Sequence, residues 1–136
     1  MQHHVDEMIR THPSPTKMEV DGRSACIEAC LDCEQACVVC ADACIAEDRT
    51  ALLIRCIRLD LDCADLCGVT ARILSRANEP DWTVIRETLQ ACLAACKSCG
   101  AECRHHTEMQ HCQVCADACD ACALACQTLL DAKKAG

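Results

Sequence analysis

Eighteen cysteines fall into four clusters along this 136-residue chain, and the spacing within each cluster is nearly constant. The clusters are Cys26, Cys30, Cys33, Cys37, Cys40 and Cys44; Cys56, Cys63 and Cys67; Cys92, Cys96, Cys99 and Cys103; and Cys112, Cys115, Cys119, Cys122 and Cys126. Within a cluster, each cysteine follows the previous one after three or four positions, and the one exception is the step of seven from Cys56 to Cys63. Such alternation keeps side chains on one face of a helix packed in a bundle. We therefore expect four helices with thiols on their inner faces.

Polar or helix-breaking residues separate the clusters. The breaks are residues 47–50, 78–80 and 105–107, and Pro80 ends any helix that reaches it. We expect helices at about residues 23–46, 50–76, 82–104 and 108–132. Short connections between long helices make neighbours antiparallel. The predicted fold is all-α, an up-down-up-down four-helix bundle with a cysteine-lined core.

Short polar side chains stand near three of the expected helix starts. Asp21 and Ser24 precede the first cluster, Asp81 follows Pro80, and Thr107 precedes the last helix. Such side chains accept hydrogen bonds from the free N–H groups of a first helical turn. We predict that they act as N-caps.

The first twenty residues stand apart from the cysteine repeats. Residues 2–11 can form a short helix before the two prolines Pro13 and Pro15. We expect residues 1–20 to be an N-terminal arm or short helix, and residues 21–136 to be a single bundle domain.

Large apolar side chains are scarce for a chain of this length. Only 31 residues are Ile, Leu, Val, Met or Trp, and the chain has no Phe or Tyr. A core built from these residues alone would be thin. We infer that the cysteines, or something bound to them, make up much of the core.

Charge and composition exclude several classes of protein. The chain has a net charge of −8, no basic block and no apolar run near 18 residues. These features argue against binding to nucleic acid or to a membrane. No export signal is visible, which favours the reducing cytoplasm, where disulfides are rare.

A lining of thiols calls for a chemical reason, because Leu or Ile would fill a core better than Cys. Thiolate is a soft ligand that favours Cu(I), zinc or iron–sulfur clusters. Structural zinc uses isolated groups of four ligands, whereas these motifs overlap, and no cysteine precedes a proline as in a common iron–sulfur motif. Each Cu⁺ replaces one thiol proton and leaves the core neutral, which favours multiple Cu(I) ions.

Cysteines four residues apart on one helix can chelate one Cu(I) between them. The candidate pairs are Cys26/Cys30, Cys33/Cys37, Cys40/Cys44, Cys63/Cys67, Cys92/Cys96, Cys99/Cys103, Cys115/Cys119 and Cys122/Cys126. Bridges across helices would connect the rest, so we expect a capacity of about one Cu(I) per cysteine.

The sequence resembles the bacterial copper storage proteins, in particular their cytosolic branch. The resemblance covers about residues 23–132 and rests on segments such as CIEACLDCEQACVVCADAC, CLAACKSCGAEC and CQVCADACDACALAC. It implies a four-helix bundle filled with thiolate-bound Cu(I), folded before the metal binds and commonly assembled as a homotetramer. A copper chaperone is then a candidate partner.

One position departs from the cysteine pattern. Asp60 falls on the inner stripe of the second helix, between Cys56 and Cys63, where the pattern expects a thiol. It is a candidate metal ligand, hydrogen-bond acceptor or proton acceptor inside the bundle. A register slip that leaves Asp60 in solvent is the alternative.

The two ends of the predicted bundle differ. At one end the stripes turn apolar, with Leu74, Trp82, Ile85, Leu89 and Leu129. At the other end, which we call the mouth, lie Cys44, Cys56, Cys103 and Cys112. Soft or borderline ligands gather there as well, namely His105, His106, Met109 and His111. We expect copper to enter at the mouth through these side chains, of which the three histidines are candidate ligands. An ordinary polar turn is the alternative.

Two other classes of function remain open. One is a metallothionein-like zinc or general thiol–metal buffer, in which the chain would fold only on binding metal. The other is a redox enzyme, which needs an exposed thiol of low pKa, usually at a helix N-terminus in an α/β fold. The predicted thiols lie in mid-helix and no strand pattern is visible, so we do not expect an enzyme.

Overall fold

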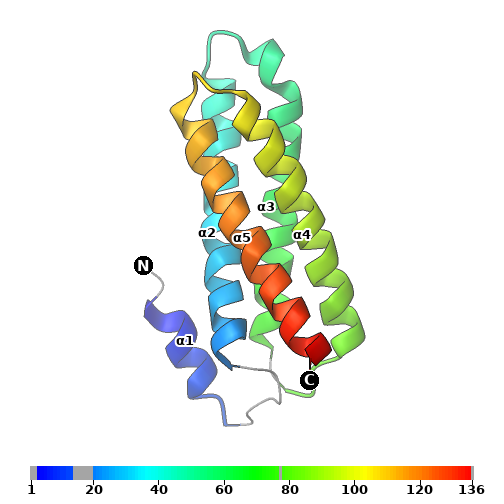
Figure 1. The fold of residues 1–136 in the computed structure, drawn as a ribbon. Helices are drawn as coiled ribbons and strands as arrows, with labels where there is room; N and C mark the ends of the chain where they lie inside the picture. Colours follow the sequence, from blue (N-terminus) through cyan, green and yellow to red (C-terminus); the bar gives the residue numbers. More distant parts are fainter. Residues whose placement is uncertain (1–2, 14–19, 77, 136) are drawn as a thin grey trace.

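Four long α-helices run alternately up and down along one axis (Figure 1). In the computed structural model, which describes residues 3–13, 20–76 and 78–135, they are α2 (Val20–Ile45), α3 (Ile54–Ser75), α4 (Trp82–His105) and α5 (Gln110–Ala135). A short helix, α1 (His3–Arg10), precedes them, and one 3₁₀ turn, η1 (Thr50–Leu53), leads into α3. The predicted up-down-up-down bundle with a short N-terminal helix is confirmed.

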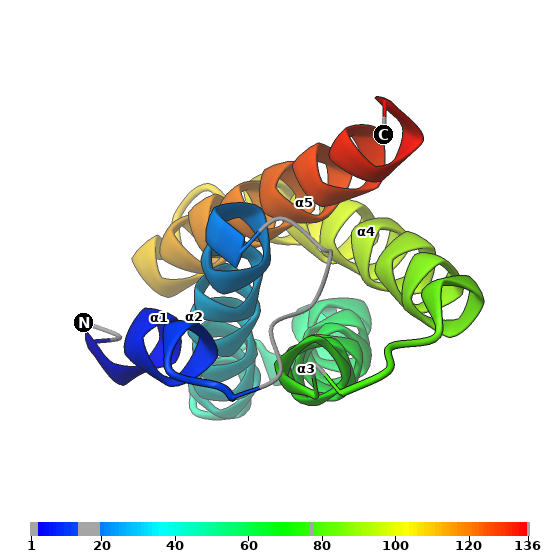
Figure 2. The ribbon, with the colours of Figure 1, turned by 90° about the horizontal axis from the view of Figure 1, so that it is seen from below.

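Each long helix packs against two others. Helix α2 contacts α3 and α5, and α4 contacts the same two helices, so the four surround a common interior (Figure 2). Helix α1 lies outside this bundle and packs against α2. No helix in the described part of the chain is long and apolar enough to cross a membrane.

The interior consists largely of thiols. Every one of the 18 cysteines is at most 1% exposed, as the spacing predicted. Large aliphatic side chains concentrate at the end of the bundle opposite the mouth, where Leu74, Ile85, Leu89 and Leu129 are buried. Trp82 is half-buried there beneath the ammonium group of Lys133, which lies 5.3 Å from the ring centroid. This apolar plug closes one end of the thiol column.

Helices α4 and α5 approach closely at Gly100. A Cβ atom at this position would lie 3.3 Å from the Cβ of Cys119 and 3.2 Å from a carboxylate oxygen of Asp120. A side chain at position 100 would therefore be in tight contact with α5. The glycine lets two thiol-bearing faces meet at this level of the bundle.

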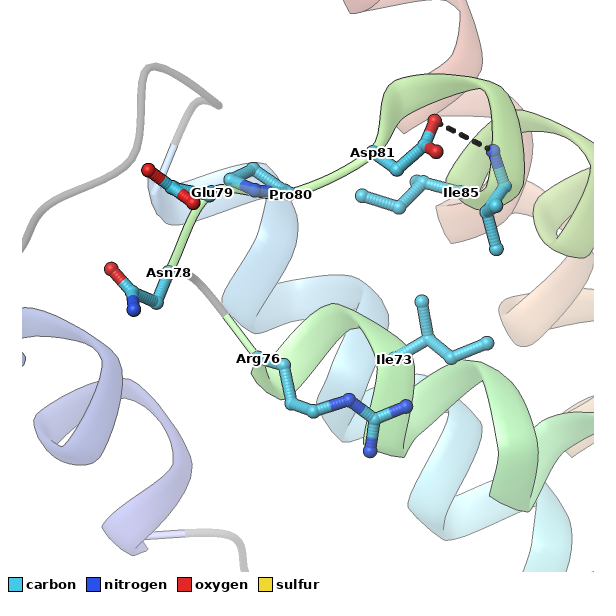
Figure 3. A pocket seen from close by; sticks show the side chains of 8 residues that line it. Ile73, Arg76, Asn78, Glu79, Pro80, Asp81 and Ile85 are labelled. Atoms are coloured by element: carbon cyan, nitrogen blue, oxygen red, sulfur yellow. Dashed lines mark hydrogen bonds between the residues drawn. The ribbon is translucent and has the colours of Figure 1, made fainter.

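The start of α4 has the predicted cap. Asp81 accepts hydrogen bonds from the backbone N–H groups of Thr83 (3.0 Å) and Val84 (3.4 Å). Figure 3 shows this turn, where a surface pocket is lined by Ile73, Arg76, Asn78, Glu79, Pro80, Asp81, Val84 and Ile85. No cysteine or histidine lines this pocket, so it is separate from the thiol interior.

The other predicted caps were wrong. Helix α2 already begins at Val20, so Asp21 and Ser24 lie within its first turns. Arg23 and Ser24 are both buried in these turns, so Ser24 does not stand at the helix start.

Helix α5 begins at Gln110, two residues later than predicted, and Thr107 does not cap it. The Thr107 hydroxyl donates instead to the carboxylate of Glu108 (3.4 Å). The side-chain amide of Gln113 donates to the carbonyls of Cys103 (3.2 Å) and His106 (3.0 Å), which closes the turn after α4. These bonds satisfy carbonyl groups at the end of α4 and do not cap the start of α5.

Candidate metal centre

The thiols form a continuous network along the axis of the bundle. Many sulfur atoms from different helices lie 3.5–4.0 Å apart. The network begins near the plug, where Cys26 and Cys126 are 3.8 Å apart, and ends at the mouth, where Cys56 and Cys103 are 3.5 Å apart. Soft ligand atoms are therefore within reach of one another over the length of the column.

Several of the predicted pairs within one helix are close. The sulfur atoms of Cys33/Cys37, Cys63/Cys67 and Cys99/Cys103 lie 3.8, 3.9 and 4.0 Å apart. The sulfurs of Cys40/Cys44, Cys115/Cys119 and Cys122/Cys126 lie within 4.8 Å of each other. Cross-helix contacts are equally short, so pairing within a helix describes only part of the arrangement.

Sets of four donor atoms also lie within 4.8 Å of one another. They include Cys30, Cys92, Cys122 and Cys126; Cys33, Cys37, Cys63 and Cys119; Cys33, Cys63, Cys67 and Cys96; Cys37, Cys99, Cys115 and Cys119; and Cys40, Cys44, His111 and Cys112. Cys33, Cys37, Cys63 and Cys119 each belong to two of these sets. Shared thiols suit bridging between metal ions better than isolated tetrahedral sites.

Burial keeps two of the mouth thiols, those of Cys44 and Cys112, protonated in the absence of metal. It raises the pKa of Cys112 to about 11, and it is also the main cause of the raised pKa of Cys44. Removing these thiols from water disfavours the charged thiolate. A bound cation must therefore displace their protons, which makes binding dependent on pH.

Asp60 lies on the inner stripe, as the main interpretation of the sequence expected, and is fully buried. Its Oδ1 accepts hydrogen bonds from the thiols of Cys99 (3.1 Å), Cys115 (3.4 Å) and Cys103 (3.5 Å). Burial is the main cause that raises the pKa of Asp60 to about 8. The register slip is thus excluded, whereas Asp62 and Asp65 on the same helix are exposed.

His111 is the mouth histidine that the structure brings against the thiols. Its Nδ1 atom lies 3.5 Å from the sulfur of Cys40 and 3.6 Å from that of Cys112. Its Nε2 atom is 2.8 Å from a carboxylate oxygen of Glu47, in the turn after α2. Imidazole and thiol groups therefore meet at the first set of donors inside the mouth.

The other two histidines lie differently. His106 pairs through Nε2 with Glu102 at 2.9 Å, and Glu102 also binds Arg55 at 3.3 Å. His105, in the last turn of α4, is exposed. The sequence predicted that all three histidines lie at one end of the bundle, but it did not predict that each has different neighbours.

Glu47 and Glu102 were missed as partners of the histidines. Both are ordinary polar residues in the sequence, and Glu47 lies 64 positions from His111. No local motif links Glu47 to His111, because that contact exists only after α2 and α5 pack together, whereas the spacing of four residues between Glu102 and His106 could have predicted their pairing. Met109, which the sequence also placed at the mouth, is partly buried and packs against the core.

Comparison with known proteins agrees with this arrangement. The sequence model of the family described as Csp, copper storage protein, matches residues 19–131. The cysteine-rich protein YhjQ of Bacillus subtilis is 41% identical over 105 residues, which are 77% of this chain and 93% of that protein.

Two solved structures are similar over most of their lengths. The copper storage protein Ccsp from Streptomyces lividans, loaded with 10 copper equivalents, has a TM-score of 0.91 and 48% identity, covering 93% of this chain and 98% of Ccsp. Metal-free Csp3 from Bacillus subtilis has a TM-score of 0.69 and 39% identity, covering 78% of this chain and 96% of Csp3. The chain therefore belongs to the copper storage protein family.

Proposed function

We propose that this chain stores many Cu(I) ions on thiolates inside its bundle. The observation that carries the proposal is the continuous column of buried thiols, supplied by all four long helices. All eighteen cysteines are the proposed ligands. The copper-loaded structure of Ccsp supports this function for a protein of the same family.

Charge and geometry favour Cu(I) over zinc. One Cu⁺ per displaced proton leaves the interior neutral, whereas an equal number of divalent ions would bury a large positive charge. The overlapping sets of donors also allow one thiolate to bridge two ions. A zinc or general metal buffer is the less favoured alternative.

Anaerobic titration of the reduced protein with Cu(I) against a strong chromophoric chelator tests the proposal. We expect uptake on the order of one Cu(I) per cysteine, with zinc as the control metal. Saturation after a few copper ions, or a preference for zinc, would contradict copper storage. Circular dichroism of the metal-free protein tests whether the store is preformed, and a coil that folds on metal binding would favour the metallothionein-like alternative.

The mouth is the proposed route for copper. His111 would receive the ion and pass it to Cys40 and Cys112, and His105 and His106 would act as transient ligands nearer to solvent. Imidazole binds Cu(I) less tightly than thiolate does, which suits transfer. Asp60, in contact with thiols deeper in the column, is proposed to organise them as a hydrogen-bond acceptor or to serve as a ligand.

Replacing His105, His106 and His111 together by alanine should slow copper loading and leave the capacity nearly unchanged. Loading rates from a Cu(I)–chelate complex and end-point titration separate the two quantities. A large loss of capacity would mean that the histidines belong to the store. An unchanged loading rate would mean that copper enters elsewhere.

We further propose storage without catalysis, in the cytoplasm, by a homotetramer that exchanges copper with a chaperone. A cytosolic copper storage protein from Streptomyces lividans, solved with five coppers, supports the location. The exposed apolar side chains of Val38, Val39 and Leu61 are consistent with association. Light scattering coupled to size-exclusion chromatography tests the assembly, and a monomer would refute it.

A further inference from the structure

Each ring nitrogen of His111 has a different neighbour. Nδ1 faces the sulfur atoms of Cys40 and Cys112, at 3.5 and 3.6 Å, while Nε2 lies 2.8 Å from the carboxylate of Glu47. A neutral imidazole carries one N–H group and one lone pair, and an ionised carboxylate only accepts hydrogen bonds. The contact with Glu47 therefore requires the N–H group on Nε2.

We propose that Glu47 is a positioning residue that holds His111 in the Nε2–H tautomer and so aims the Nδ1 lone pair at the two thiols. Only an unprotonated nitrogen can bind a metal ion. Carboxylates that orient the far nitrogen of a histidine commonly set the geometry and basicity of the metal-binding nitrogen. The inference rests on the proposed uptake role of His111 and deepens it.

Glu47 is itself held in place by the turn after α2. Its backbone N–H donates to the carbonyl of Cys44 (3.2 Å). Its carbonyl accepts a hydrogen bond from the hydroxyl of Thr50 (2.8 Å), which also contacts the carbonyl of Ile45 (3.1 Å). With both backbone groups bonded, Glu47 presents its side chain from a fixed point beside the mouth. Such preorganisation is what a positioning residue needs.

The opposite side of the contact is fixed as well. His111 lies in the first turn of α5, next to Cys112, whose backbone N–H donates to the carbonyl of Met109 (3.1 Å). The side chains of His111 and Glu47 are about one quarter and one third exposed (25% and 35%). An arriving ion can therefore reach this pair from solvent, while Cys40 and Cys112 behind it are buried.

The tautomer of His111 can be measured without copper. Long-range ¹H–¹⁵N correlation spectra of the reduced, metal-free protein at pH 8 report which ring nitrogen carries the proton. We expect a single Nε2–H form in the unmodified protein and a mixture of tautomers in Glu47→Ala. A mixed or Nδ1–H form in the unmodified protein would overturn the proposal, as would a single Nε2–H form in Glu47→Ala.

Loading kinetics supply the second measurement. With a Cu(I)–bicinchoninate complex as donor, we expect Glu47→Ala to load about tenfold more slowly, at unchanged capacity. Glu47→Gln, which keeps an oxygen acceptor, should restore both the tautomer and most of the rate. Asp48→Ala is the matched control, because it removes a carboxylate from the same turn at an exposed position. Equal rates for the Gln and Ala variants, or equal slowing in Asp48→Ala, would assign the effect to charge alone and overturn positioning.

The His111→Ala variant separates this inference from the proposed function. If His111→Ala loads at the unmodified rate, the uptake role of the histidine fails, whatever the tautomer. If His111→Ala is slow and Glu47→Ala is not, uptake through His111 stands and the positioning role of Glu47 is refuted.

Discussion

Replacing Asp60 by asparagine changes the charge of a fully buried side chain while nearly preserving its size and shape. In the folded protein, burial raises the pKa of Asp60 to about 8, against about 3.9 in an unfolded chain. Between these two values the folded state binds more protons at this position than the unfolded state. The free energy of unfolding must therefore fall as the pH rises through this window.

The magnitude follows from the width of the window. One pH unit corresponds to about 1.4 kcal/mol for one such group. Between pH 5 and pH 7.5, the metal-free protein should thus lose about 3 kcal/mol through Asp60. Asparagine cannot ionise, so this part of the pH dependence should be absent from Asp60→Asn. The variant should approach the stability of the unmodified protein only near pH 4, and its advantage should grow steadily from pH 5 to pH 7.5.

Urea denaturation of the reduced, metal-free proteins at several pH values measures the difference. Asp62→Asn is the matched control, because Asp62 is exposed on the same helix, and its pH profile should run parallel to that of the unmodified protein. Parallel profiles for Asp60→Asn and the unmodified protein between pH 5 and pH 7.5 would refute the reasoning. They would mean that Asp60 is ionised when folded, stabilised by its thiol donors.

Three further predictions concern packing, capping and proton release. Gly100→Ala should fail to raise the free energy of unfolding by the about 1 kcal/mol that alanine's better helix propensity supplies, because the new methyl group would lie 3.3 Å from the Cβ of Cys119. A full gain of about 1 kcal/mol in urea denaturation would contradict the close approach of α4 and α5. Asp81→Ala should lower the free energy of unfolding by about 1 kcal/mol through the lost N-cap, with copper capacity unchanged in titration. An unchanged free energy of unfolding would mean that the cap is dispensable. Lowering the pH from 8 should weaken the apparent Cu(I) affinity about tenfold per pH unit for each proton displaced, because protons compete with the metal for the thiolates. Competition titrations that show no effect of pH would contradict the replacement of thiol protons by copper.

The helical fold and its thiol interior could be predicted because helical periodicity is a local property. Steps of three and four residues place Cys26 and Cys44 on the same face of one helix, whatever packs against it. The same rule put Asp60 among the thiols, and its burial confirms that register. The cap at Asp81 is equally local, since it involves residues two and three positions away.

The starts of α2 and α5 are features that the sequence misplaced, because a short polar side chain is only a weak signal of where a helix begins. Helix α2 begins at Val20, earlier than expected, and Arg23 and Ser24 are buried within its first turns. Helix α5 begins at Gln110, and the side-chain amide of Gln113 closes the turn before it by donating to carbonyls at the end of α4. Capping preference is worth about 1 kcal/mol, which such contacts readily outweigh.

By itself, then, the sequence determined which residues face inward and at which end the histidines gather. The tertiary structure decided which inward residues touch, such as Cys56 with Cys103 across α3 and α4, and which histidine meets the thiols. It also paired Glu47 with His111 across 64 residues of chain. The reason is physical: the face of a helix follows from its own repeat, whereas contacts between helices depend on their mutual rotation and axial offset, which only packing sets.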